Sequence, residues 1–183
     1  GQPGRDELLT AVTLGEPVEV PVVGVSFATG NALAAEAADG DVSVRVTTST
    51  KAEVLKTKNI IADTPKGKSG TTVVVGAHLD SVLAGPGIND NGSGSSTILE
   101  IAEQMKALGY TKKGKLQRQV RFAFWGAEEE GTLGSEYYVS SLSAEKLSTI
   151  YANLNFDMVG SPNYVRFVYD GDGSDTPDAG PAG

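Results

Sequence analysis

The sequence predicts an α/β fold in which a mixed β-sheet is flanked by helices, giving three layers. Apolar side chains alternate with others at Val120, Phe122 and Phe124, as in a strand that covers a core. Residues 98–108 instead carry apolar side chains at intervals of three and four, the spacing of an amphipathic helix. Because strand and helix patterns take turns along most of the chain, we expect a sheet with helices on its faces.

The first 50 residues are expected to form a unit of their own. Residues 18–25 are rich in valine, and residues 42–46 alternate between valine and other residues, so each segment predicts a strand. The alanine-rich residues 26–40 between them predict a short helix with Ser26 or Thr29 as its N-cap. A strand, a helix and a strand over about 30 residues are too few to be stable without more chain.

A second unit is predicted over residues 51–183. Residues 59–63 and 71–78 predict two neighbouring strands, because only the turn-rich segment 65–70 separates them. A glycine-rich loop over residues 85–94 then leads into the amphipathic helix. The later elements are expected in this order: a strand over 120–124, a helix over 133–142, and strands over 152–156 and 164–169. Residues 170–183 contain only small, acidic and hydroxyl residues with proline, which predicts a loop or a disordered end.

Composition and charge exclude several classes of protein. The chain has 183 residues, a mass of 18.9 kDa, a net charge of −8 and a pI near 4.6. Such an acidic chain repels phosphate backbones and anionic membranes, so we expect no nucleic-acid or membrane partner. It has no cysteine, which excludes disulfides, thiol catalysis and sulfur-bound zinc, and His78 is its single histidine. Its apolar runs are far shorter than the roughly 20 residues that span a bilayer.

Acidic or imidazole side chains follow four places where strands are predicted to end or a helix to begin. These residues are His78 with Asp80, then Asp90, then Glu128, Glu129 and Glu130, and finally Asp157. Ligands of α/β sheets bind at the carboxyl ends of the strands, so we expect these side chains to gather at one edge. Carboxylates crowded together repel one another unless a cation lies between them. The pattern therefore predicts a metal site, although each residue alone could equally be a cap, a turn or a solvated helix start.

The types of ligand narrow the choice of metal and of chemistry. One imidazole with several carboxylates suits zinc, or else manganese or cobalt, better than copper or an iron–sulfur cluster. A carboxylate that bridges two such ions can help them activate a water for hydrolysis. Glu128 and Glu129 are adjacent, so one could bind metal while the other stays free to take a proton from that water.

Five motifs carry a family resemblance, and they occur in the family's order. They are GAHLDS at 76–81, GINDNGSG at 87–94, WGAEE at 125–129, GS followed by YY at 134–138, and NFDMVG at 155–160. In these motifs the chain resembles the secreted bacterial zinc aminopeptidases that have two co-catalytic zincs. The resemblance runs from about residue 59 to residue 169, and residues 1–50 resemble the end of a protease-associated domain.

The resemblance implies a role for each candidate site residue. His78 and Asp157 would bind the first zinc, Asp90 would bridge both zincs, and Glu129 would bind the second. Glu128 would be the general base that acts on the zinc-activated water and then protonates the departing amine. Asp80 would hold the His78 ring in its metal-binding tautomer. The implied protein is a secreted, extracellular enzyme that removes N-terminal residues, large and apolar ones above all, from peptides or proteins.

One feature of the family is missing from this sequence. The family supplies a second zinc-binding histidine from a later Tyr-His segment, whereas this chain has only His78. The resemblance therefore implies one complete zinc site in this chain, formed by His78, Asp90 and Asp157, and the 183 residues alone are expected to have little or no activity. We expect the catalytic domain to be incomplete here, with residues 51–183 as its N-terminal and central part.

Three alternatives remain open at this point. A carboxypeptidase or dipeptidase of the same fold would need a cation for the substrate carboxylate, and the sequence does not point to one. A glutaminyl cyclase-like enzyme shares the fold and uses one zinc. The third alternative is a non-catalytic protein-binding segment whose acidic loops bind calcium. Serine hydrolase chemistry is disfavoured because the chain has no Gly-x-Ser-x-Gly motif.

Overall fold

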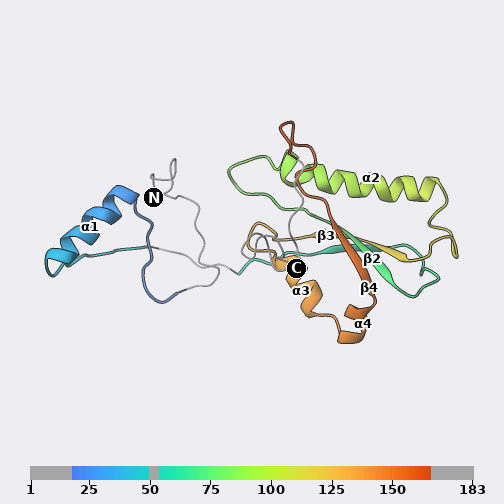
Figure 1. Cartoon of the computed structure of the whole chain (residues 1–183), viewed down its shortest axis with the longest axis horizontal. Helices are drawn as coiled ribbons and strands as arrows, with labels where there is room; N and C mark the ends of the chain where they lie inside the picture. Colours follow the sequence, from blue (N-terminus) through green and yellow to red (C-terminus); the bar gives the residue numbers. More distant parts are fainter. Residues whose placement is uncertain (1–17, 50–53, 166–183) are drawn as a thin grey trace, which may run out of the picture.

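The computed structural model describes residues 18–49 and 54–165, and a mixed sheet lies at its centre (Figure 1). In the described residues the sheet has four strands in the order β1-β3-β2-β4. β2 is parallel to β3 on one side and to β4 on the other, and β1 is antiparallel to β3. The strands are β1 (Ile60–Asp63), β2 (Thr72–His78), β3 (Gln119–Trp125) and β4 (Ile150–Asn155). This confirms the mixed α/β sheet expected from the sequence.

In chain order the helices are α1 (Phe27–Asp39), the kinked helical turn η1 (Ile88–Ser93), α2 (Gly94–Ala107), α3 (Leu133–Ser140) and α4 (Ala144–Ser148). α2 lies above the sheet, α3 and α4 lie below it, and α1 lies away from it at the left of Figure 1. The predicted amphipathic helix corresponds to α2, and the predicted helix over 133–142 corresponds to α3. Of the helices described, none is long and apolar enough to cross a membrane.

Two apolar clusters hold the three layers together, one on each face of the sheet. On one face, Ile98 of α2 packs between Val75 and Phe122 of the two central strands, and Ile101, Ala102 and Met105 extend this contact. On the other face, Val74, Ala123 and Trp125 pack against Tyr138 of α3. Strand residues therefore alternate between the two faces, as the period of two requires. Leu108, counted in the predicted helical stripe, is the C-cap of α2 and is 71% exposed.

The expected pairing of the first two strands is wrong. β1 does not neighbour β2, because β3 lies between them. Ile60 pairs with Phe124 and Asp63 with Arg121, and the Arg121 guanidinium donates to both carboxylate oxygens of Asp63 at 2.7 and 2.6 Å. This ion pair joins residues 58 positions apart in the sequence. The short segment between β1 and β2 predicts that these two strands are neighbours, because it contains no sign of this distant contact.

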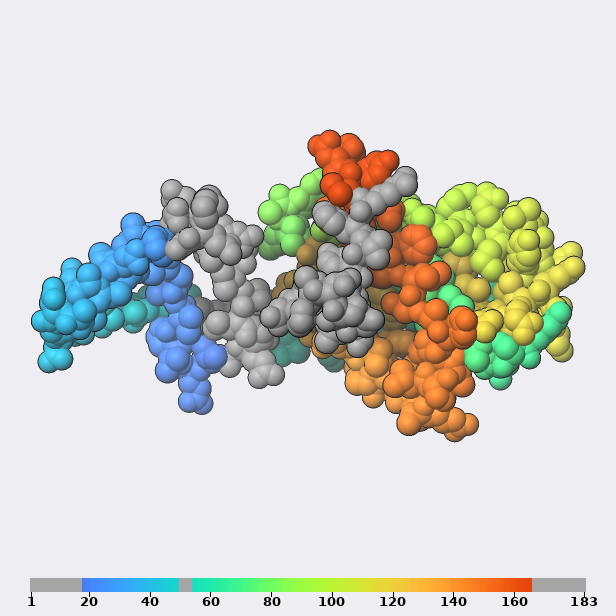
Figure 2. Space-filling view, viewed as in Figure 1, coloured from blue at the N-terminus to red at the C-terminus, as the bar shows by residue number. Residues whose placement is uncertain are grey.

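The two strands expected in the N-terminal unit are also wrong. Residues 18–25 and 42–46 contain no strand, and their valines are 39–66% exposed. A strand needs a hydrogen-bonding neighbour, and the described residues offer none to these segments. The helix between them is confirmed as α1, with Ser26 accepting a hydrogen bond from the Thr29 backbone N–H as the N-cap. Figure 2 shows this segment apart from the body formed by α2, α3, α4 and β4.

Some predictions fall outside the described residues. Of the strand predicted over 164–169, the structure describes only residues 164 and 165, which are not in a strand. The predicted loop over 170–183 lies outside the described residues. The division into units at residues 1–50 and 51–183 stays a prediction.

We expect Ile98→Ala to lower the free energy of unfolding by about 2–5 kcal/mol. Ile98 is 0% exposed, so truncation removes buried contacts between α2 and the sheet and leaves a cavity. Leu99→Ala is the matched control, because the neighbouring Leu99 is 52% exposed, and its cost should stay within about 1 kcal/mol. Urea denaturation of both variants measures the difference. Equal losses would contradict the placement of α2 over the core.

Candidate metal centre

His78 lies at the carboxyl end of β2 and is 2% exposed. Its Nδ1 lies 3.0 Å from the backbone oxygen of Asp80, and Ser95 on α2 donates to the His78 backbone oxygen at 2.6 Å. A neutral imidazole that donates Nδ1–H to this carbonyl carries its lone pair on Nε2. The local backbone therefore favours the tautomer in which Nε2 can bind a metal.

Carboxylates from three other segments surround the Nε2 atom of His78. Asp90 Oδ1 lies 3.0 Å from Nε2, Asp157 Oδ2 lies 3.6 Å away, and Glu128 Oε2 lies 3.8 Å away. The potential ligand atoms of His78, Asp90 and Asp157 all lie within 4.8 Å of one another. The loops after β2, β3 and β4 thus meet at one edge of the sheet, as expected for the carboxyl ends of parallel strands.

The surroundings of His78 Nε2 fit a bound cation. This nitrogen is buried and has no hydrogen-bond partner within the described part of the chain. A buried polar atom without a partner is costly, and a metal ion would satisfy it. One imidazole nitrogen with carboxylate oxygens suits zinc among the common metals. The residues present therefore fit a zinc ion held by His78, Asp90 and Asp157.

Mutual electrostatic effects shift the pKa values of this group. Burial acts to lower the pKa of His78, but the charges of Asp157 and Glu128 act against it and leave the pKa raised. Burial raises the pKa of Glu128, and the charges of Asp157 and Glu129 raise it further, against the opposing effect of His78. Glu128 is thus a carboxylate whose proton affinity is increased at the edge of the site, as a general base requires.

Asp80 links the imidazole to the loop that carries the glutamates. Its two carboxylate oxygens accept the backbone N–H groups of Glu128 at 3.0 Å and Glu129 at 3.1 Å. Burial acts to raise the pKa of Asp80, but these two hydrogen bonds lower it overall. The Asp80 carboxylate itself is 3.6 Å from His78 Nδ1, so its backbone oxygen makes the shorter contact with the ring.

Known proteins share their sequence with most of this chain. The model of "Peptidase family M28" matches residues 59–179. The chain belongs to peptidase family M28. It is 47% identical over 178 residues to an "Aminopeptidase" of Pseudomonas aeruginosa, covering 96% of this chain and 31% of the relative. It is 46% identical over 175 residues to "Leucine aminopeptidase 2" of Trichophyton equinum, covering 94% of this chain and 34% of the relative.

A solved structure supports the M28 fold of this chain. The "Aminopeptidase from Aneurinibacillus sp. strain AM-1" superposes with a TM-score of 0.64 at 32% identity, covering 82% of this chain and 37% of that protein. The chain spans about a third of the length of the curated relatives it matches.

Asn91, which is not among the candidate residues predicted from the sequence, joins two loops of the candidate site. It is 2% exposed, donates from Nδ2 to the Phe156 backbone oxygen at 2.9 Å, and accepts the Gly94 N–H on Oδ1 at 2.9 Å. Any Cβ at Gly94 would collide with this Phe156 oxygen, so α2 can begin here only with glycine. Asp90 precedes Asn91 and Asp157 follows Phe156, so this bridge holds the two carboxylates side by side. The position of Asn91 between Asp90 and a helix start was the available signal.

Glu129, expected as a ligand of a second metal, lies outside the group formed by His78, Asp90 and Asp157. Its Oε1 accepts a hydrogen bond from the backbone N–H of Val82 at 3.2 Å. The structure brings the Glu129 backbone to the site through Asp80 but directs its carboxylate to the loop after β2.

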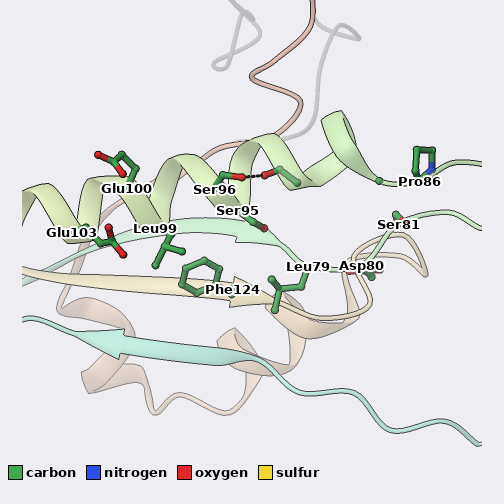
Figure 3. Close-up of a pocket in the computed structure, with 12 residues that line it drawn as sticks. Leu79, Asp80, Ser81, Pro86, Ser95, Ser96, Leu99, Glu100, Glu103 and Phe124 are labelled. Atoms are coloured by element: carbon green, nitrogen blue, oxygen red, sulfur yellow. Dashed lines mark hydrogen bonds between the residues drawn. The ribbon is translucent and has the colours of Figure 1, made fainter.

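A cavity of about 520 Å³ adjoins the metal edge between α2 and the end of β2 (Figure 3). Leu79, Leu99 and Phe124 form its apolar side, and Glu100 and Glu103 of α2 also line it. The cavity reaches the metal centre through Asp80, and none of the three residues that could hold the metal lines it.

We expect Asn91→Asp to destabilise the chain by about 1–3 kcal/mol. A carboxylate cannot donate to the Phe156 oxygen, and it adds a negative charge to a region already rich in carboxylates. Asn153→Asp, the same change on an exposed residue of β4, is the control and should cost far less. Chemical denaturation of both variants checks this expectation. A cost for Asn153→Asp that matches that of Asn91→Asp would argue against the bridging role.

Proposed function

We propose that this protein is a zinc-dependent aminopeptidase that removes N-terminal residues from peptides. The observation that carries the proposal is the buried Nε2 of His78, which has no hydrogen-bond partner among the described residues and faces Asp90, Glu128 and Asp157. Relatives named aminopeptidase support the reaction, and those named leucine aminopeptidase 2 support a preference for large apolar N-terminal residues.

The residues would divide the work as follows. His78 and Asp157 would hold one zinc, Asp90 would reach both zincs, and Glu129 would bind the second after turning away from Val82. Bound zinc supplies a Lewis acid that polarises the peptide carbonyl and lowers the pKa of a water molecule. Glu128 would take the proton from the attacking water and return it to the leaving amine, which its raised pKa favours.

The acidic surroundings also support exopeptidase specificity. Glu128 and Asp157 lie near the same imidazole nitrogen, and the four groups that meet there are His78 and three carboxylates, with no lysine or arginine. Such a site would attract the ammonium group of a free N-terminus rather than a substrate carboxylate. A carboxypeptidase would need the opposite charge at this position.

Peptides blocked at one end test the proposed specificity. The test uses a zinc-loaded protein that carries this sequence together with the second zinc-binding histidine of the family. It should hydrolyse peptides that have leucine at a free amino terminus and an amidated carboxyl terminus. Peptides acetylated at the amino terminus should not be hydrolysed. Calorimetric zinc titration of the 183-residue chain should show binding with a stoichiometry of one or two. Cleavage of acetylated peptides, or no zinc binding, would refute the proposal.

A further inference from the structure

A second cavity, of about 390 Å³, lies at the end of the sheet opposite to the metal centre. Thr72, Gln119 and Ile150 line it, and these residues begin the three parallel strands, whereas the metal centre follows the ends of the same strands. Tyr138 of α3 and Lys146 of α4 close the other side. The volume is in the range of pockets that bind small molecules.

The charges around the two cavities are opposite. Asp80, Glu100 and Glu103 line the cavity beside the metal centre, with no basic residue. Lys66, Arg121 and Lys146 line the second cavity, with no acidic residue. Residues 66 and 67 line it, and their loop is joined to the positively charged loop 112–118 by the Lys68 N–H to Leu116 O hydrogen bond of 3.2 Å. In a chain of net charge −8, this positive region is a local exception.

Three hydrogen-bond donors in this cavity, on Lys66, Tyr138 and Lys146, have no acceptor among the described residues. The side-chain donors of Thr72, Gln119 and Thr149 are already used within the protein. Lys66 and Lys146 form no ion pair within residues 18–49 and 54–165. Tyr138 accepts a hydrogen bond from Arg121 at 2.7 Å, which leaves its own O–H free to donate. The backbone oxygens of three lining residues are taken: Thr71 by Gln119 N, Thr149 by Thr72 N, and Lys146 by Thr149 Oγ1.

Arg121 is fixed as part of the wall. Its hydrogen bonds to Asp63, helped by the one to Tyr138, raise its pKa despite its burial, so it stays charged. Because Asp63 balances this charge, the net positive charge of the cavity comes from Lys66 and Lys146. The two positive charges of these ammonium groups would balance the charge of a phosphate group, which is about −1.5 to −2 at neutral pH.

We infer that this cavity binds a phosphate group, either free or carried by a small polar molecule, through Lys66, Lys146 and the Tyr138 hydroxyl. The hydroxyl oxygens of Thr72 and Thr149, whose protons go to Gln119 Oε1 and the Lys146 backbone oxygen, would accept hydrogen bonds from the polar part of such a molecule. The site is separate from the metal centre and does not depend on the aminopeptidase proposal.

Calorimetry on the full chain with glucose 6-phosphate, inorganic phosphate and glucose tests this inference. We expect both phosphate probes to bind and glucose not to bind. Equal affinities would identify free phosphate as the ligand, whereas tighter binding of glucose 6-phosphate would show that the sugar contributes. Binding should strengthen between pH 5 and pH 7.5, since phosphate loses its second proton near pH 6.

A pair of matched variants separates a built site from general attraction to positive charge. The double variant Lys66→Gln and Lys146→Gln should weaken binding of glucose 6-phosphate by at least about tenfold. The double variant Lys112→Gln and Lys113→Gln removes the same charge from exposed residues that do not line the cavity, and it should leave the affinity nearly unchanged. Circular dichroism verifies that both variants fold. Equal weakening in both, or no binding of either phosphate probe, would overturn the inference.

Discussion

Glu128→Gln is expected to lower the kcat of peptide hydrolysis by about 10²–10⁴-fold while leaving bound zinc unchanged. Glu128 Oε2 lies 3.8 Å from His78 Nε2, yet Glu128 is not among the three residues whose ligand atoms cluster within 4.8 Å. An amide has almost the same shape as the carboxylate but cannot accept a proton from water. The loss should therefore fall on proton transfer and not on metal binding.

Glu130→Gln is the matched control for this variant. Glu130 belongs to the same run of three glutamates, but it is exposed and should leave both activity and zinc unchanged. The first readout is hydrolysis of leucyl p-nitroanilide by the zinc-loaded protein that also carries the second zinc-binding histidine. The second readout is the zinc content by mass spectrometry. Retained turnover in Glu128→Gln, or a loss of zinc equal to the loss of activity, would rule out the role of general base.

The location of the candidate site could be predicted from sequence because it depends on local patterns. The sequence predicted strands over 71–78, 120–124 and 152–156, and these appear as β2, β3 and β4. Parallel strands end at one edge, so residues just after them had to meet, as His78, Glu128 and Asp157 do. This prediction of the site needed only the positions at which the strands end in the sequence, not the distances between side chains.

What the sequence could not provide depends on contacts between distant residues. The insertion of β3 between β1 and β2 depends on pairing such as Asp63 with Arg121, and no local pattern encodes that choice. The predicted strands over 18–25 and 42–46 have suitable composition but no strand beside them among the described residues. β-propensity is a weak guide when the neighbour is absent.

Some details of the site also depend on contacts that the residue types do not reveal. Asp80 was expected to orient the imidazole, and the structure shows its backbone oxygen next to the ring while its carboxylate holds the Glu128 and Glu129 N–H groups. Asn91 lies between Asp90 and a helix start in the sequence, but its bonds to Phe156 and Gly94 are what show that it positions Asp90. Such positioning roles depend on backbone atoms, which residue types do not specify.

Removal of one predicted zinc ligand should reduce the affinity of the 183-residue chain for zinc by more than about 100-fold. This exceeds the loss of affinity expected when a residue that only hydrogen-bonds to a ligand is removed. His78→Ala tests the nitrogen ligand, but His78 is 2% exposed and its loss could also disturb folding. Asp157→Asn avoids this difficulty, because the Asp157 side chain is 35% exposed and the change replaces one oxygen by an amide nitrogen.

Zinc titration with a competing chelator measures both variants, and Glu130→Gln again serves as the control of equal charge change for Asp157→Asn. If His78, Asp90 and Asp157 hold the metal together, the two ligand variants lose zinc while Glu130→Gln keeps it. Comparable weakening in Glu130→Gln would show that zinc is attracted only by the overall negative charge of this edge. The lone pair on His78 Nε2 would then need a hydrogen-bond donor or another cation, because a buried nitrogen without a partner is costly.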